Sequence, residues 1–237
     1  MMEFARQIRY MGIYAALCGE GGTNATVYLL LLLAGCIAAY LLGSINSAIL
    51  ISRAKYHEDI RNYGSKNAGM TNMLRTYGKG AGILTLVLDM LKAVLSVLIA
   101  VLLAGQDGGY CAMVFCMLGH MFPLYFHFKG GKGVAVAAAS ILCLEPLAFL
   151  VMVVVFAAVV AMTKYVSLGS VMAALLYPLF LNRLYLLLHG SDPGIFVSGA
   201  SLIAALLVVI MHRENIRRLL AGKEAKLDLH GRKKEEK

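Results

Sequence analysis

A stretch rich in glycine and lysine, residues 119–133, has the composition of a phosphate-binding loop. It reads GHMFPLYFHFKGGKG, and its last five residues are Lys129, Gly130, Gly131, Lys132 and Gly133. Glycine lets backbone N–H groups approach a ligand closely, and successive N–H groups in a turn form an anion-binding nest. A helix that begins near Gly133 would add the positive end of its dipole. The spacing matches neither a Walker A loop nor a dinucleotide-binding fingerprint, so a basic loop that only sets membrane topology is the alternative.

A second polar segment, residues 59–79, has further groups that bind anions. It reads DIRNYGSKNAGMTNMLRTYGK. Hydroxyl and amide groups donate hydrogen bonds to oxyanions, and a guanidinium can hold one through two parallel bonds. The residues of this kind are Ser65, Asn67, Thr71, Asn72 and Arg75. A solvent-exposed linker of similar composition is the alternative.

Two pairs of polar residues are spaced three apart, which places each pair on one face of a helix. Asp89 and Lys92 lie within an apolar run. A charge near the centre of a bilayer costs about 2.5–3.5 kcal/mol, so we predict that these two form an internal ion pair. His212 and Asn215 follow the last apolar run and would face one site at the membrane boundary. The histidines and cysteines lack the spacings of a metal site, and we expect neither a metal nor another cofactor.

The composition as a whole is that of an integral membrane protein. The 237-residue chain is 60% hydrophobic and 15% charged, whereas a soluble domain is about 45–50% apolar and about 25% charged. A bilayer is crossed by about 20 apolar residues, and a spanning segment must satisfy its own backbone as a helix. Seven spans are predicted, at residues 27–51, 80–103, 110–128, 134–144, 147–162, 167–188 and 194–211. The short fourth span could be a half-helix.

The distribution of lysine and arginine predicts the orientation of these spans. Basic residues lie in segments 52–79 and 129–133, at Lys164 and after Met211, whereas the connections at 105–109, 145–146 and 189–193 have none. By the positive-inside rule, the basic loops and the C-terminus face the cytoplasm and the N-terminus faces out. We therefore predict an all-α, polytopic integral membrane protein with seven transmembrane helices. Residues 1–26 would form an N-terminal extension of unknown role, 27–212 the membrane domain and 213–237 a basic cytoplasmic tail.

Five segments in series resemble one family of enzymes. They read LLGSINSA (41–48), DIRNYGSKNAGMTNMLRTYGKGAG (59–82), GHMFPLYFHFKGGKGVA (119–135), YVSLGS (165–170) and HRENIRRLLAGKE (212–224). Together they closely resemble the bacterial acyl-phosphate:glycerol-3-phosphate 1-acyltransferases of the PlsY type. The resemblance implies a seven-helix enzyme of the bacterial cytoplasmic (inner) membrane, with its active site facing the cytoplasm. Such an enzyme makes lysophosphatidic acid from acyl phosphate and glycerol 3-phosphate, the first acylation of phospholipid synthesis.

The resemblance also implies partners and functional residues. The partners are the two substrates, membrane lipid and, in a transient contact, the enzyme that produces acyl phosphate; no nucleic acid is expected. The family's loop serine and arginine, its loop lysine, a serine entering the sixth helix, and its C-terminal histidine and asparagine fall on Ser65, Arg75, Lys132, Ser170, His212 and Asn215. Where the family loop usually has glycine and alanine, this chain has Lys66 and Met70.

An acyl phosphate is an activated mixed anhydride, so such an enzyme mainly needs to position its substrates and stabilise charge. We expect Ser65, Arg75 and Lys132 to bind the phosphate of glycerol 3-phosphate. The backbone of residues 130–133 would hold the acyl-phosphate headgroup. The other residues that we assign to substrate binding are Asn67, Thr71, Asn72, Lys129 and Ser170.

Three residues, His212, Asn215 and Ser65, form the expected catalytic set. His212 and Asn215 would orient the 1-hydroxyl of glycerol 3-phosphate. The base is either His212, because an ordinary histidine pKa of about 6.5 suits neutral pH, or the departing phosphate. No acyl-enzyme is required, so Ser65 need not be a nucleophile. His120, Asp89 and Lys92 are expected to support the site.

Two other classes of protein share some of these features. A transporter of organic phosphate also needs basic groups among several helices, but its binding groups would lie near the midplane on broken helices. An acyltransferase of the soluble-donor type would have a histidine and an aspartate five positions apart. No histidine in this chain has an aspartate at that spacing.

Overall fold

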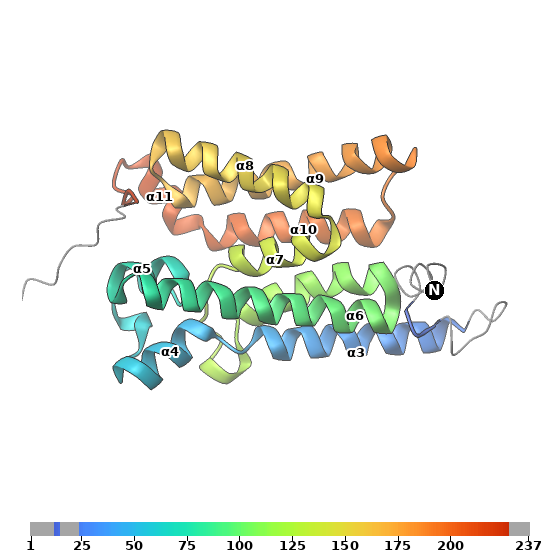
Figure 1. Ribbon diagram of the computed structural model, residues 1–237, viewed down its shortest axis with the longest axis horizontal. Helices are drawn as coiled ribbons and strands as arrows, with labels where there is room; N and C mark the ends of the chain where they lie inside the picture. The colour runs from blue at the N-terminus through green and yellow to red at the C-terminus, as the bar shows by residue number, and fades with distance from the viewer. Residues whose placement is uncertain (1–11, 15–23, 228–237) are drawn as a thin grey trace, which may run out of the picture.

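The computed structural model describes residues 12–14 and 24–227, and this part of the chain consists of helices and loops without strands. Most helices run along the long axis of the molecule (Figure 1). The predicted all-α class is therefore confirmed. Most of the predicted N-terminal extension and the end of the predicted tail lie outside the described residues.

Several helices have the length and composition of membrane spans. In chain order the helices are α3 (Ala25–Gly43), α4 (Ser47–Tyr56), η1 (Ile60–Asn62), α5 (Met70–Tyr77), α6 (Lys79–Met121), η2 (Leu124–Phe126), α7 (Val134–Leu144), α8 (Pro146–Thr163), α9 (Val166–His189), α10 (Ile195–Met211) and α11 (Arg213–Leu220). Four stretches are long and apolar enough to cross a bilayer: Ala25–Tyr56, Lys79–Phe126, Pro146–Thr163 and Val166–Leu188. Helices α10 and α11, bent by 56°, make a fifth if they count as one span. The predicted number of seven and the orientation of the termini stay predictions.

Helix α6 folds back on itself. Ala104 and Gly105 leave the helical region, with φ of −133° and 66°. Lys92 and His120 are 28 residues apart in α6, yet Lys92 Nζ lies 2.9 Å from His120 Nδ1. A rise of 1.5 Å per residue would separate them by about 40 Å in a straight helix. The helix therefore consists of two antiparallel arms that meet at Gly105, between the predicted second and third spans.

Helix α3 packs against the second arm of α6 through glycines. A Cβ at Gly43 would lie 2.3 Å from the carbonyl oxygen of Cys116, and a Cβ at Gly119 would lie 2.3 Å from that of Tyr40. Small residues let two membrane helices approach until their backbones touch. This close contact brings the end of α3 beside the segment 119–133.

The connection between α3 and α4 is held by Asn46, which is fully buried. Its Oδ1 caps α4 by accepting a hydrogen bond from the N–H of Ile49 at 3.0 Å. Its Nδ2 donates to the carbonyl of Ala68 at 3.3 Å. One side chain thus begins α4 and attaches the polar loop 59–79 to the membrane helices.

A buried lysine joins three segments beneath the loops. Lys92 Nζ lies 3.0 Å from Asp89 Oδ1, so the predicted internal ion pair is confirmed. The ammonium also donates to the carbonyls of Gly43, at 3.1 Å, and Ile45, at 2.7 Å, where α3 ends. Its contact with His120 reaches the second arm of α6. Lys92 therefore ties the end of α3 to both arms of α6.

We expect Gly43→Ala to lower the unfolding temperature of the protein in detergent. The new Cβ would overlap the Cys116 carbonyl, and overpacking of this kind costs about 1–3 kcal/mol. Gly199→Ala, within α10, is the matched control, because a Cβ there meets no heavy atom of the described residues within 4 Å. Equal unfolding temperatures for Gly43→Ala and the wild type would contradict backbone contact between α3 and α6.

We expect Lys92→Met to be more damaging, because it leaves the buried Asp89 carboxylate and two carbonyls without their cation. Removing one partner of a buried ion pair costs roughly 3–5 kcal/mol. Lys79→Met, at the exposed start of α6, is the control for the change in side chain. Thermal unfolding in detergent measures both variants, and a loss in Lys92→Met no larger than that in Lys79→Met would refute the structural role of the ammonium.

Candidate active site

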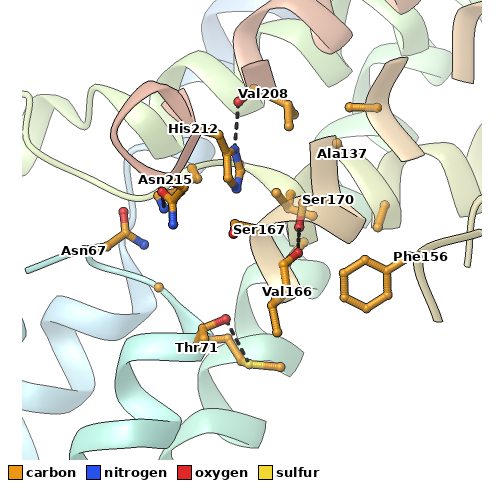
Figure 2. A pocket seen from close by; sticks show the side chains of 18 of the residues that line it. Asn67, Thr71, Ala137, Phe156, Val166, Ser167, Ser170, Val208, His212 and Asn215 are labelled. Atoms are coloured by element: carbon orange, nitrogen blue, oxygen red, sulfur yellow. Dashed lines mark hydrogen bonds between the residues drawn. The ribbon is translucent and has the colours of Figure 1, made fainter. Parts of the chain in front are cut away.

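A cavity of about 850 Å³ extends from the polar loops into the helices. Figure 2 shows His212 and Asn215 facing the same space as Ser167. The predicted site residues that line the cavity are Ser65, Asn67, Thr71, Asn72, Arg75, Asp89, His120, Lys132, Gly133, Ser170, His212 and Asn215. Those that do not line it are Lys92, Lys129, Gly130 and Gly131. The structure thus brings together residues from four of the five segments that resemble the family, whereas no residue of 41–48 lines the cavity.

The first turn of α7 faces this cavity. Gly133 precedes α7 with φ of 76°, a left-handed conformation that favours glycine. Its carbonyl accepts the first hydrogen bond of the helix, from the N–H of Ala137 at 2.8 Å. Gly133, Val134 and Ala135 line the cavity. The predicted start of a helix at residue 134 is therefore confirmed, and its positive dipole end lies at the cavity.

Gly130 and Gly131 have a different role from the expected one. Their N–H groups donate to the carbonyls of Met121, at 3.1 Å, and His120, at 3.0 Å. A Cβ at Gly131 would lie 2.2 Å from His120 Nε2. These glycines let the loop pack against the end of α6, and their N–H groups are used within the chain. This corrects the expectation that the backbone of residues 130–133 as a whole holds a phosphate, because two of its donors already have partners.

Lys132 belongs to a polar network that crosses the cavity. Its ammonium donates to Asn215 Oδ1. Asn215 Nδ2 donates in turn to Glu224 Oε1 at 2.5 Å. Glu224 also accepts hydrogen bonds from Arg218 Nε at 2.7 Å and Ser167 Oγ at 2.8 Å. One carboxylate therefore holds three parts of the chain in one cluster: the C-terminal segment, the start of α9 and residues 129–133, which we call the lysine loop.

The electrostatics of this cluster favour an anionic ligand. Burial lowers the pKa of Lys132 to about 8, with Arg218 and Arg75 acting in the same direction and Glu224 opposing them. Burial by itself would raise the pKa of Glu224, but hydrogen bonds from Asn215, Arg218 and Ser167 outweigh it and the net shift is downward. Three cationic side chains thus stand around one carboxylate, so the cluster retains positive charge for a phosphate.

His212 is buried at the end of α10, with 3% of its surface exposed. Its Nδ1 lies 2.8 Å from the carbonyl oxygen of Val208, which can only accept a hydrogen bond. Nδ1 therefore carries the proton, and the lone pair is on Nε2. Burial, followed by the Lys132 cation, lowers the pKa of His212 to about 4. At neutral pH the ring is an uncharged hydrogen-bond acceptor.

Asn72 shapes the polar loop from within. Its Oδ1 accepts from the N–H of Ser65 at 2.9 Å, and its Nδ2 donates to the carbonyls of Tyr63, at 3.0 Å, and Ile60, at 3.3 Å. The side chain is 1% exposed. Asn72 lines the cavity, but its amide groups are used to hold Ser65 in place.

The rim of the cavity has groups with freer side chains. Arg75 and Ser65 are exposed, whereas Asn67 and Thr71 are half-buried. Arg75 Nη2 makes a long hydrogen bond, of 3.4 Å, to the carbonyl of Ala225. Most of the donors on this guanidinium can therefore turn toward a ligand.

The hydrogen-bonded cluster contains three residues that the sequence analysis did not assign to the site: Ser167, Arg218 and Glu224. Arg218 lies three positions after Asn215, and this helical spacing, continued from His212, could have identified it. Ser170, which was predicted, donates its hydroxyl to the carbonyl of Val166 at 2.9 Å and can offer a ligand its oxygen as an acceptor (Figure 2).

The deeper part of the cavity is apolar. Small side chains of α7, α9 and α10 line it, namely Ala137, Ala138, Ala173, Ala174, Ala204 and Ala205. Along α9 the lining changes from Ser167 near the polar cluster to Tyr177, about 15 Å away at 1.5 Å per residue. The site thus has a charged mouth and a long apolar interior, which suits an amphiphilic ligand.

Comparisons with known proteins identify the family. The family model described as glycerol-3-phosphate acyltransferase matches residues 33–222. A glycerol-3-phosphate acyltransferase of Finegoldia magna is 39% identical over 203 residues, which cover 84% of this chain and 98% of the relative. One from Clostridioides difficile is 42% identical over 205 residues, which cover 84% and 95%.

Two crystal structures share the fold. The glycerol 3-phosphate form of PlsY (YgiH), an integral membrane glycerol 3-phosphate acyltransferase, has a TM-score of 0.76 at 38% identity, and the match covers 83% of this chain and 96% of that chain. The lysophosphatidic acid form has a TM-score of 0.72 at 36% identity and covers 84% and 96%. The resemblance inferred from five sequence segments is confirmed: this chain belongs to the glycerol-3-phosphate acyltransferase family.

Proposed function

We propose that this protein transfers an acyl group from acyl phosphate to the 1-hydroxyl of glycerol 3-phosphate, giving lysophosphatidic acid and inorganic phosphate. The observation that carries the proposal is the shape of the cavity, which joins a cluster of Lys132, Arg75 and Arg218 to a long apolar interior. One substrate has a phosphate and hydroxyls, and the other has a phosphate and an alkyl chain. The PlsY crystal structures, with a glycerol 3-phosphate form and a lysophosphatidic acid form, support the same pairing.

The two phosphates would be bound by different groups. Lys132, Arg75 and Ser65 hold the phosphate of glycerol 3-phosphate, with Asn67 and Thr71 as further donors at the rim. The acyl-phosphate headgroup lies at the first turn of α7, where Gly133 permits close approach and the helix dipole favours an anion. Its alkyl chain lies among the alanines of α7, α9 and α10.

The reaction needs no covalent intermediate on the enzyme. The 1-hydroxyl oxygen attacks the acyl carbonyl carbon, the bond from that carbon to the phosphate oxygen breaks, and the phosphate departs with the bonding electrons. The hydroxyl proton passes to His212 Nε2 or to the departing phosphate. Asn215 and Lys132 orient the nucleophile and stabilise the negative charge, and Ser65 acts as a hydrogen-bond donor.

We also propose seven membrane segments, with the N-terminus outside and the C-terminus in the cytoplasm. The fold-back of α6 supports this count, because each arm serves as one segment, and α7 adds a short, largely buried one. Helices α5 and α11 lie at one end of the molecule and the start of α3 at the other (Figure 1). The active site would lie on the cytoplasmic side of a bacterial inner membrane. There it could receive acyl phosphate from the enzyme that produces it.

The proposed donor is tested with protein purified in detergent. Palmitoyl phosphate with glycerol 3-phosphate should give lysophosphatidic acid and inorganic phosphate, whereas palmitoyl-CoA should give no product. We expect Lys132→Ala and Arg75→Ala to raise the KM for glycerol 3-phosphate by tenfold or more, because each removes about 1.5–3 kcal/mol of charged hydrogen bonding.

Three outcomes would contradict parts of this proposal. Product from palmitoyl-CoA alone would overturn the donor, and normal kinetics in both variants would overturn the phosphate assignment. Folded protein that gives no product from either donor would overturn the enzymatic function. Uptake of glycerol 3-phosphate into proteoliposomes would then test the transporter alternative.

The lowered pKa of Lys132 predicts an alkaline limit to activity. The ammonium loses its proton as the pH rises through about 8, and the uncharged amine no longer attracts a phosphate dianion. The kcat/KM for glycerol 3-phosphate, which reports groups of the free enzyme, should therefore fall above that pH. Lys132→Arg should lack this decline, whatever its absolute activity, because arginine stays protonated. The same alkaline limb in both proteins would show that Lys132 is not the titrating group.

A further inference from the structure

A second pocket, of about 590 Å³, lies beside the active-site cavity. We call it the loop pocket. It is lined by Asp59, Arg61, Asn62, Lys66, His127, Lys129 and Gly130. Lys66 lines both the loop pocket and the active-site cavity, so the two adjoin at this residue. The proposed reaction uses none of the residues that line the loop pocket.

Two of the charged residues in the loop pocket are already paired. Arg61 Nη2 lies 2.7 Å from Asp59 Oδ2, and Arg61 Nη1 donates to the carbonyls of Phe126, at 2.9 Å, and Lys129, at 3.0 Å. The hydrogen bond from Arg61 holds the pKa of Asp59 well below its usual range. Asp59 also pairs with Arg53 at 2.9 Å. This carboxylate is therefore charged but fully compensated.

The ammonium groups of Lys66 and Lys129 supply the positive charge that remains. Both side chains are exposed, and within the described residues no ion pair joins either of them to a carboxylate. Asn62, also exposed, adds an amide donor. A phosphate monoester carries about 1.5–2 negative charges at neutral pH, which matches two ammonium groups.

Exposed apolar residues lie next to the loop pocket in the chain. Leu124, Tyr125 and Phe128, just before Lys129, are 46%, 53% and 55% exposed. In a membrane protein such side chains contact lipid, and tyrosine is enriched at the level of the headgroups. Lys129 of the loop pocket thus lies within five residues of exposed apolar side chains that could contact lipid.

Residues with left-handed backbone conformations gather at the same place. Lys66, His127 and Phe128 have φ of 58°, 57° and 56°. Residues other than glycine rarely adopt this backbone conformation. Where they do, the surrounding structure holds them in it, often at ligand sites. The loops that form the pocket are therefore held in a defined shape.

We propose that the loop pocket binds the phosphate monoester group of a membrane lipid, through Lys66, Lys129 and Asn62, while the lipid chains lie along Leu124 and Phe128. Because Lys66 also borders the active-site cavity, this site would receive lysophosphatidic acid as it leaves for the bilayer. That identification of the physiological lipid rests on the proposed function, whereas the binding itself does not.

The test measures lipid binding rather than activity. Native mass spectrometry would follow the titration of dioleoyl phosphatidic acid into Lys132→Ala protein in a neutral detergent. This variant is used because it weakens phosphate binding in the active-site cavity. We expect phosphatidic acid to bind more tightly than phosphatidylcholine. Adding Lys129→Gln should weaken it about fivefold, which corresponds to the roughly 1 kcal/mol of one lysine near an anionic headgroup. Adding Lys66→Gln should have a similar effect.

Lys79→Gln, which removes an exposed lysine outside both pockets, is the matched control and should leave the affinity unchanged. In the wild-type background, Asn62→Ala should keep the KM for glycerol 3-phosphate, because Asn62 lines the loop pocket and lies outside the active-site cavity. Equal affinities for phosphatidic acid with and without Lys129→Gln would overturn the proposal. So would displacement of the lipid by inorganic phosphate at equal concentration, because the site would then hold a soluble anion.

Discussion

The buried ammonium of Lys92 is the contact on which the arrangement of the site depends. It joins Asp89, the ring of His120 and the carbonyls of Gly43 and Ile45, which come from the end of α3 and both arms of α6. A charge in apolar surroundings is costly when unpaired. The segments therefore cannot separate without exposing either the cation or its partners to a medium that solvates neither.

His120 connects this buried contact to the lysine loop. Its carbonyl accepts the N–H of Gly131, and its ring occupies the space that a side chain at that position would need. Lys132 follows directly and donates to Asn215 at the start of α11. A chain of contacts thus leads from the membrane interior to the polar end of the cavity. The loop keeps its irregular backbone because Gly131 bonds to α6 and Lys132 bonds to α11.

Local sequence pattern was sufficient to predict several features of this protein. The lengths of the apolar runs predicted helices α7 to α10 to within one residue at each end. The predicted first span, 27–51, was wrong in its continuity, because the chain breaks between α3 and α4, and the predicted third span, 110–128, continues past the end of α6 at Met121. The spacing of three between Asp89 and Lys92 predicted their ion pair, because residues one turn apart on a helix must meet. Five segments in series identified the family, and twelve of the predicted site residues line one cavity.

Tertiary structure decided which polar groups remain available to a ligand. The amides of Asn72 and the N–H groups of Gly130 and Gly131 had the chemistry of phosphate donors, but they bond to the chain itself. Lys129 lies in a separate pocket, although it is only three residues from Lys132. A donor in the sequence does not reveal whether its partner will be a substrate or a distant carbonyl. That depends on contacts such as the one from Lys132 to Asn215, 83 residues away, which form when the helices pack.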